Sequence, residues 1–338
     1  MAQATNYFPS QNVEVWYQKE TNVGTQPDDA GLTKLQTTSF SIPEASVPVE
    51  YSAQRAGHFT MTASQGHHSQ GTKMWTFDTT LRGTPKSVLL ATDAVFEQAS
   101  SEAALNNDYT FPSATYVTAA GSAATFEFRW INGGSDAANH NLVMQGCVGT
   151  GFTLTEDIGS EGGELVCTIS WASAFPPVYS ADDISSPAYD EGTPKNIRSL
   201  ASGTTGINGG ALEELVIQSW ELSVSRTIER ISYKDQTDGS YAPFGYAMTG
   251  GFEVTGSITC LRNDDVYDLI DGNEFVNSTT VDINITEDSS FIIALDKCLL
   301  NEPSIDNGGP ALTETIPFTV VGADNIGSTV KMLGITIA

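Results

Sequence analysis

Residues 71–90 read GTKMWTFDTTLRGTPKSVLL and pass from an alternating pattern into a helical one. Trp75, Phe77 and Leu81 share one parity, and small polar residues lie between them, which predicts a strand with one buried face. Thr84 can cap a helix whose first residue is a proline, a position where the missing N–H costs nothing. The stretch therefore predicts a strand that leads directly into a helix.

A similar stretch, GGFEVTGSITCLRNDDVYDLI, occupies residues 250–270. A Leu-Arg pair precedes the helical pattern in both stretches, at Leu81 and at Leu261, an offset of 261 − 81 = 180 residues. Further along, Cys147 aligns with Cys298 at an offset of 298 − 147 = 151. Chance similarity between alternating strands is the alternative, but the shared order of strands and helix favours an internal duplication.

Period-2 alternation continues through most of the chain, so we predict an all-β protein with minor α content. The duplication predicts two tandem β-sandwich or barrel domains, each with a short flanking helix; the second helix is expected after Asn263. The predicted divisions are an N-terminal arm (1–35), a first domain (36–175), a Pro-, Gly- and Ser-rich linker or arm (176–210) and a second domain (211–338). Long loops are expected at 20–39, 56–71, 175–210 and 233–251.

The chain is strongly acidic, with 15 Lys and Arg against 41 Asp and Glu and a formal charge of −26. Attractive, non-specific binding of nucleic acid needs clustered cations, so this balance argues against it. The first residues show no basic segment followed by an apolar one, and no apolar run reaches about 18 residues. We therefore expect a soluble protein that is neither exported nor embedded in a membrane.

The four cysteines have no CxxC spacing, and three of them lie in apolar alternating runs. We expect buried free thiols, which pack as small hydrophobic groups. A disulfide between Cys147 and Cys167 is the alternative, and it would need an oxidising compartment.

Catalytic signatures are absent: there is no GxSxG, Walker loop or HExxH. His67 and His68 could bind a transition metal, but nothing nearby completes a site, so a solvated loop is favoured. Acidic clusters at 27–31, 180–185 and 188–193 could bind calcium or supply a glycosidase pair, although solubilising acids explain them as well. We predict no enzyme activity, no cofactor and no metal.

The polar faces of two predicted strands carry only hydroxyls and glutamates. Neither Ser219–Thr227 nor Glu253–Thr259 contributes a Lys or Arg to its outward parity. A face of this kind would suit a passage through which a polyanion slides without sticking. An ordinary acidic surface is the alternative.

The chain resembles the tail tube proteins of long-tailed bacteriophages (siphophages), of the kind with a duplicated tube domain. Its opening, VEVWYQKETNVGTQPDDAG, and the stretches at 71–90 and 144–173 look like successive strands of that module. Each motif is short, but together they span nearly the whole chain. The matching elements at the start are Trp16-Tyr17, Lys19-Glu20-Thr21, Gly24-Thr25-Gln26-Pro27, and Glu50 with Arg55.

The resemblance implies a structural virion protein that performs no chemistry. Such a subunit assembles with itself into helically stacked rings, here as a homotrimer with pseudo-sixfold symmetry or alternatively as a homohexamer, and viral DNA crosses the lumen without specific binding. Its other partners would be the tape measure protein and the tail terminator and distal tail proteins, and it would be assembled in the host cytoplasm and reside in the virion tail. The side chains expected to face the lumen are Glu50, Asp78, Glu221, Glu253, Ser223, Ser225, Thr255 and Ser257.

A carbohydrate-binding or adhesin-like β-sandwich remains a second hypothesis. Four aromatic residues favour it, because sugars stack on exposed rings: Trp16, Trp75, Trp130 and Tyr241. A glycosidase is the third, and it would need two carboxylates on facing strands, such as Asp78 and Glu253.

Overall fold

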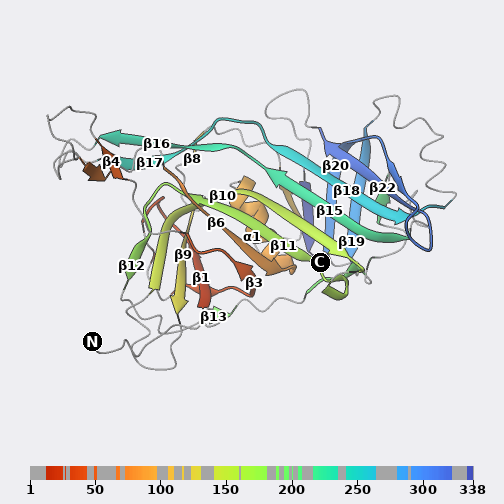
Figure 1. Ribbon diagram of the computed structural model, residues 1–338, viewed down its shortest axis with the longest axis horizontal. Coiled ribbons are helices and arrows are strands. Elements are labelled where there is room, and N and C mark those ends of the chain that lie inside the picture. The colour runs from red at the N-terminus through yellow and green to blue at the C-terminus, as the bar shows by residue number, and fades with distance from the viewer. Residues whose placement is uncertain are drawn as a thin grey trace, which may run out of the picture.

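The computed structural model is mostly β, with a large antiparallel sheet and one α-helix among the residues that it describes (Figure 1). This confirms the predicted all-β class. Residues described are 13–25, 27, 31–43, 49–51, 66–68, 73–96, 106–109, 116–117, 123–130, 141–159, 161–180, 188–189, 194–197, 200, 205–207, 216–234, 241–263, 280–287, 291–321 and 333–337.

The strands are short at the ends of the chain and long in its middle. Their bounds are β1 Val13–Lys19, β2 Thr33–Lys34, β3 Thr37–Phe40, β4 Val49–Tyr51, β5 Gly66–His68, β6 Trp75–Arg82, β7 Asn106–Tyr109, β8 Tyr116–Val117, β9 Ala124–Trp130, β10 Asn141–Asp157, β11 Val166–Ser173, β12 Val178–Ser180, β13 Ala188–Tyr189, β14 Gly206–Ile207, β15 Ile217–Ser225, β16 Ile228–Lys234, β17 Tyr241–Met248, β18 Glu253–Leu261, β19 Val281–Glu287, β20 Phe291–Leu300, β21 Ser304–Asp306, β22 Thr313–Val320 and β23 Leu333–Ile337.

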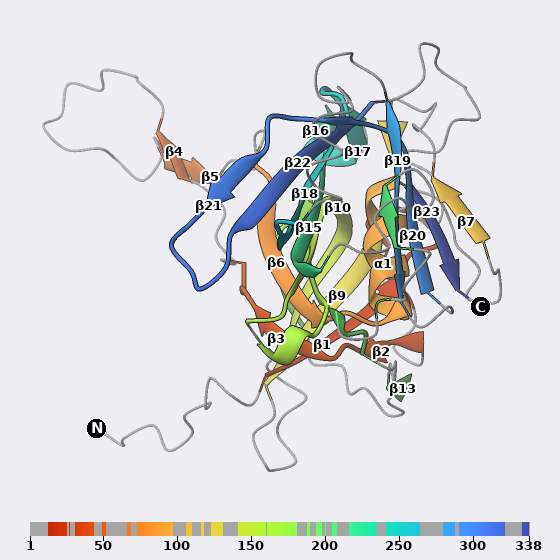
Figure 2. The same ribbon diagram turned by 90° about the vertical axis from the view of Figure 1, so that its right-hand side faces the viewer.

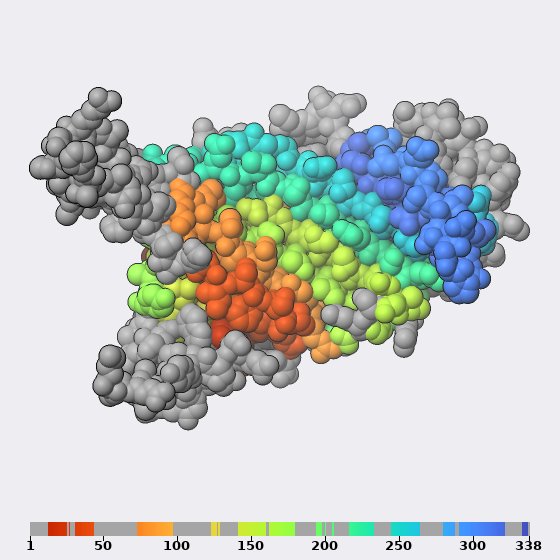
Figure 3. Space-filling model, in the orientation of Figure 1, coloured from red at the N-terminus to blue at the C-terminus, as the bar shows by residue number. Residues whose placement is uncertain are grey.

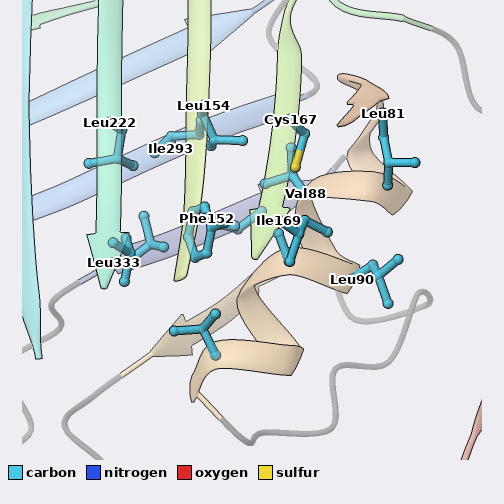
Figure 4. Packing of buried hydrophobic residues seen from close by; sticks show 14 of the residues in the cluster. Leu81, Val88, Leu90, Phe152, Leu154, Cys167, Ile169, Leu222, Ile293 and Leu333 are labelled. Atoms are coloured by element: carbon cyan, nitrogen blue, oxygen red, sulfur yellow. The ribbon is translucent and has the colours of Figure 1, made fainter. Parts of the chain in front are cut away.

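The predicted helix is α1, Pro85–Phe96, and it starts as expected. Its cap is reciprocal, since the Ser87 N–H donates to Thr84 Oγ1 at 3.1 Å and the Thr84 N–H donates to Ser87 Oγ at 2.8 Å. Val88 and Leu90 extend from α1 into the buried side of the sheet (Figure 4). The second predicted helix, after Asn263, lies outside the described residues.

Strand β6 has the alternation expected of it. Trp75, Phe77 and Leu81 are buried, whereas Thr76 and Asp78 are exposed. The buried parity meets α1, which covers one side of the sheet (Figure 2). One face of this sheet is therefore core and the other is open to solvent.

The same strand order occurs twice. Six strands of the first half pair as β1-β9-β10-β11-β6-β3, and six of the second half pair as β14-β19-β20-β22-β18-β15. The two sets join where the second part of β10 pairs with β15. Together they form one main sheet in the order β3-β6-β11-β10-β15-β18-β22-β21.

The irregularities of pairing recur at matching places. The β3–β6 register shifts at Thr38, and the β15–β18 register shifts at Gln218, which is 218 − 38 = 180 residues later. The β9–β10 register shifts just before Cys147, and the β19–β20 register shifts just before Cys298. Each of these two thiols donates to the carbonyl three residues earlier.

The Leu-Arg alignment differs from this register by one residue. Leu81 is opposite Cys167 in β11, and the buried residue at the matching place in β18 is Cys260, not Leu261. The offset for these strands is 260 − 81 = 179, because one residue fewer separates β15 from β18 than β3 from β6. Leu261, on the other parity, is only half buried.

Several segments expected as loops contain strands. Residues 233–251 were expected to be a loop, but they include the end of β16 and all of β17, which form an antiparallel hairpin. The segment 175–210 contains β12, β13 and β14, and 20–39 contains β2 and β3. Proline and glycine in these segments weaken the local strand signal, while pairing with distant strands supplies the hydrogen bonds.

All four cysteines are buried and free, so the disulfide alternative is wrong. Burial raises the pKa of the Cys147 and Cys167 thiols, which keeps them protonated. Within the described part of the chain, no helix has the length and apolar character needed to cross a membrane.

Candidate functional site: the polar face of the main sheet

Hydroxyl side chains form a row that crosses six strands of the main sheet. Adjacent members are direct register partners, and at the usual strand spacing the row spans about 24 Å. Every member is half exposed. The row consists of Thr80, Thr168, Thr153, Ser223, Thr255 and Thr319.

A row of polar residues flanks this one on each side. One row contains two of the carboxylates, and the other contains the third. The first flanking row is Asp78, Ser170, Gly151, Ser225 and Glu253. The second is Arg82, Val166, Thr155, Glu221, Ser257 and Pro317. We call these three rows the polar face.

The polar face brings together seven of the eight residues singled out in the sequence. They come from β6, β15 and β18, which meet through β10 and β11. Figure 3 shows how segments of both halves of the chain lie side by side on one face of the molecule. The seven are Asp78, Glu221, Glu253, Ser223, Ser225, Thr255 and Ser257.

Glu50 lies elsewhere. It belongs to β4 and is opposite His67 of β5, in a two-stranded sheet separate from the main one (Figure 2). The side chains of Glu50, His67 and His68 lie outside the described residues, so the possible metal pair is not resolved further. In register, Val49–His68 occupies the place that Glu229–Ala247 occupies in the β16–β17 hairpin.

Cross-strand hydrogen bonds hold the short side chains of the face close to the sheet. Ser170 Oγ donates to Asp78 Oδ1 at 2.7 Å, and the hydroxyls of Thr80 and Thr168 are 3.2 Å apart. Side chains bonded in this way project little from the strands and lose little further freedom. The face is consequently smooth as well as polar.

One cation lies on the three rows, and it is already bound. Arg82 donates to both carboxylate oxygens of Glu164, with N–O distances of 2.7, 2.8 and 3.1 Å. A guanidinium held in a bidentate pair offers less charge to a passing phosphate. The exposed charges that remain on the rows are the carboxylates of Asp78, Glu221 and Glu253.

The geometry disfavours the two other hypotheses. Asp78 and Glu253 are four strand spacings apart, about 19 Å, whereas glycosidase carboxylates lie about 5 to 9.5 Å apart. Trp16 and Trp75 are buried, so neither ring offers a stacking surface for sugar. Trp130 and Tyr241 have side chains outside the described residues. The described residues contain no cluster of three or more metal-ligating side chains.

A buried carboxyl, which the sequence gave no reason to single out structurally, holds the turn after β1. Glu20 accepts hydrogen bonds from Thr125 Oγ1 at 2.6 Å and from the N–H groups of Gly146 and Gly24 at 2.7 and 2.6 Å. Desolvation raises the pKa of Glu20 despite these hydrogen bonds.

Two residues of the second half anchor it on the first. Arg226 is buried and donates to the carbonyls of Gly149, at 2.8 Å, and Ala94, at 3.1 Å. The Tyr246 hydroxyl donates to the Gly146 carbonyl and accepts from the Ala174 N–H at 3.0 Å. These contacts join residues far apart in sequence, and no local pattern predicts them.

A pair of buried carboxyls lies at the junction of the halves. Glu156 of β10 and Glu287 of β19 are both almost fully buried, and the Trp220 indole donates to Glu156 Oε2 at 2.5 Å. Desolvation, and then the neighbouring Glu287, raise the pKa of Glu156 far above its ordinary value. The pair therefore retains a proton at neutral pH.

No protein-family model matches the chain, and no curated protein matches it either.

Proposed function

We propose that the protein is a structural subunit of the tail tube of a long-tailed bacteriophage, and that its polar face lines the passage for DNA. The observation that carries the proposal is the polar face itself. Its rows run without interruption from the strands of one half, across β10, to the strands of the other half.

The physical argument is one of weak contact. Lys and Arg bind DNA by displacing the counterions of its phosphates, so a wall without free cations holds no part of the duplex. Carboxylates repel the phosphates, and short hydroxyls leave no side chain to catch on the DNA. Three chains in a ring would carry 3 × (−26) = −78 formal charges.

We further propose that the chain carries two tandem tube domains, each a β-sandwich with a flanking helix. The repeated strand order and the register shifts at Thr38 and Gln218 support a duplication. Three chains would then make a ring of pseudo-sixfold symmetry, with a homohexamer as the alternative. Such a protein would act with the tape measure, tail terminator and distal tail proteins in the virion, and would not be an enzyme.

Electron microscopy and mass measurement of the purified chain test this proposal. At high protein concentration we expect rings or tubes with a central channel, and a smallest ring whose mass is three times the 36.0 kDa of one chain. Dispersed monomers at every concentration would overturn the proposal. A ring of six chains would retain the tube and overturn the pseudo-sixfold trimer.

A further inference from the structure

We infer that the free edge of β21 in one copy of the chain pairs with the free edge of β3 in another, in a register that places Ile305 opposite Ile42. The inference rests on the proposed assembly into rings and adds which edges meet and how. β3 and β21 are the two end strands of the main sheet. In the described residues, β3 pairs only with β6, and β21 pairs only with β22.

The junction inside the chain provides the template. The second part of β10 pairs with β15 over seven positions, from Gly151–Ser225 to Asp157–Ser219. At its centre Leu154 is opposite Leu222, and both side chains are fully buried. If β21 corresponds to this part of β10, and β3 to β15, the same junction can form between two copies.

β21 does occupy the place of the second part of β10. Leu154 is opposite Cys167 of β11, while Ile305 is opposite Glu314 of β22. The offset between the strands' first members is 305 − 154 = 151, the same as between Cys147 and Cys298. Both registers also shift by one residue on the way, in β10 between Gly149 and Gly151 and in the second half between β20 and β21.

β3 occupies the place of β15 in the same way. Phe40 is opposite Thr79, and Trp220 is opposite Ile258, an offset of 220 − 40 = 180. Beyond β3 the pairing with β6 continues, because the Ser41 N–H donates to the Asp78 carbonyl at 3.0 Å. The next residue, Ile42, therefore corresponds to Leu222.

The two isoleucines are exposed where their counterparts are buried. Ile305 is 52% exposed and Ile42 is 42% exposed, whereas Leu154 and Leu222 are fully buried. Unpaired edge strands with apolar side chains are sites of strand addition. Pairing the edges would cover both side chains and give the backbone groups of both strands hydrogen-bond partners.

The contact joins two different surfaces of the chain, so it is heterologous. Each copy keeps one free edge of each kind after pairing once, and repeated pairing closes a ring if the rotation allows. The template limits the pairing to about Ser39–Ile42 against Ile305–Gly308, since the next residue is Pro43, which has no N–H to donate.

Cysteine cross-linking tests the register. Directly opposite residues on antiparallel strands have Cα atoms about 4.5 to 5.5 Å apart, within reach of a disulfide. We expect mild oxidation of the Ile42→Cys, Ile305→Cys double variant to give covalent oligomers up to the ring size on a denaturing gel. The Ile42→Cys, Asp306→Cys variant is the matched control, because a shift of one residue moves the thiol to the other face and removes the cross-link.

Charge substitutions test whether the contact drives assembly. Ile42→Glu and Ile305→Lys should each reduce ring formation at least tenfold, and the double variant should restore it, because the new charges are opposite each other. Ile158→Lys is the control, since Ile158 is similarly exposed (47%) but lies in neither edge. Unchanged melting of the monomers would show that folding is intact.

The outcomes separate the two proposals. Rings that form without the specific cross-link, and that survive Ile305→Lys, would overturn the edge assignment and leave the tube in place. Cross-linking in both double variants would overturn the register. Unmodified protein that never oligomerises would overturn both the edge assignment and the proposed function.

Discussion

Gly146 and Lys297 have the same left-handed backbone, with φ of 60° and 54°, at the same point of two strands 297 − 146 = 151 residues apart. Each precedes a buried cysteine and lies at a shift of strand register. Lys297 is the one residue other than glycine with positive φ among those described. A lysine is strained in this region, so the turn of the strand must require the conformation.

Lys297→Gly should stabilise the protein. Glycine adopts positive φ without the steric cost that a Cβ brings, and the gain should be about 0.5 to 1 kcal/mol after the larger entropy of the unfolded chain is counted. Denaturant unfolding of the variant checks this, with Lys297→Ala as the control that keeps a Cβ. A Lys297→Gly variant less stable than the Lys297→Ala variant would contradict the expectation.

Gly146→Ala should have the opposite effect. A Cβ at this position would come within 2.4 Å of the Phe175 ring and would also meet the positive φ. We expect a loss of about 2 kcal/mol or more, since strain and overpacking add. Gly162→Ala separates the two causes, because Gly162 has φ 72° but nothing within 4 Å of an added Cβ. Equal losses at both positions would show that packing against Phe175 is unimportant.

Tyr246→Phe should destabilise the join between the two halves. The variant leaves the Ala174 N–H and the Gly146 carbonyl buried without their partner, which costs about 2 to 3 kcal/mol. Tyr179→Phe is the matched control, since Tyr179 is 69% exposed and should tolerate the loss of its hydroxyl. Thermal melting of the two variants gives the comparison, and equal melting temperatures would sink the assignment of Tyr246 as an anchor.

Stability should fall as pH rises. The pKa of Glu156, of Glu20 and of Glu314 is raised in the folded chain, by desolvation first in each case. The folded state therefore holds protons that the unfolded chain has released, so the stabilisation is complete below the ordinary pKa of about 4.5 and is lost as pH rises through the folded values. Unfolding measured from pH 5 to 9 checks the direction.

Glu156→Gln tests the source of that slope. An amide cannot release the proton, so the variant should lose less stability on alkalinisation, by up to about 1.4 kcal/mol per pH unit. Glu221→Gln is the control, because Glu221 is exposed. A pH profile of Glu156→Gln that follows the unchanged protein would rule the buried pair out as the cause.

Glu221→Lys combined with Glu253→Lys should leave assembly intact and impede DNA. The two side chains lie in neighbouring strands on the polar face, so the change replaces two repulsive charges per half-ring segment with cations that bind phosphate. We expect phage carrying the variant to lose infectivity at least tenfold, and the Gln double variant to remain close to normal. Normal infectivity of the Lys variant would contradict the lumen assignment and not the tube.

Local patterns were sufficient for some of these features. The alternation in β6 predicted its buried face, and Thr84 with Pro85 predicted the start of α1, because capping and parity depend on neighbours in the sequence. The polar parities of β15 and β18 placed seven residues on one face for the same reason. Glu50 could not be placed, since its strand has only three residues and joins a separate hairpin.

Other features depend on contacts between distant segments. The offset of β22 from β11 is 316 − 169 = 147, not the 150 that the aligned letters suggest, and only strand pairing fixes it. The Glu156–Glu287 pair and the Arg226 contacts each join residues more than 70 positions apart. Sequence periodicity carries no information about such partners.

The 17-residue strand β10 has a consequence for how the chain unfolds. Its first part pairs with β9 and β12, and its second part is shared between β11 of the first half and β15 of the second. Neither half can lose its structure without exposing an edge of the other. The two halves should therefore melt in one cooperative transition, and a gene fragment for either half alone should yield an insoluble product.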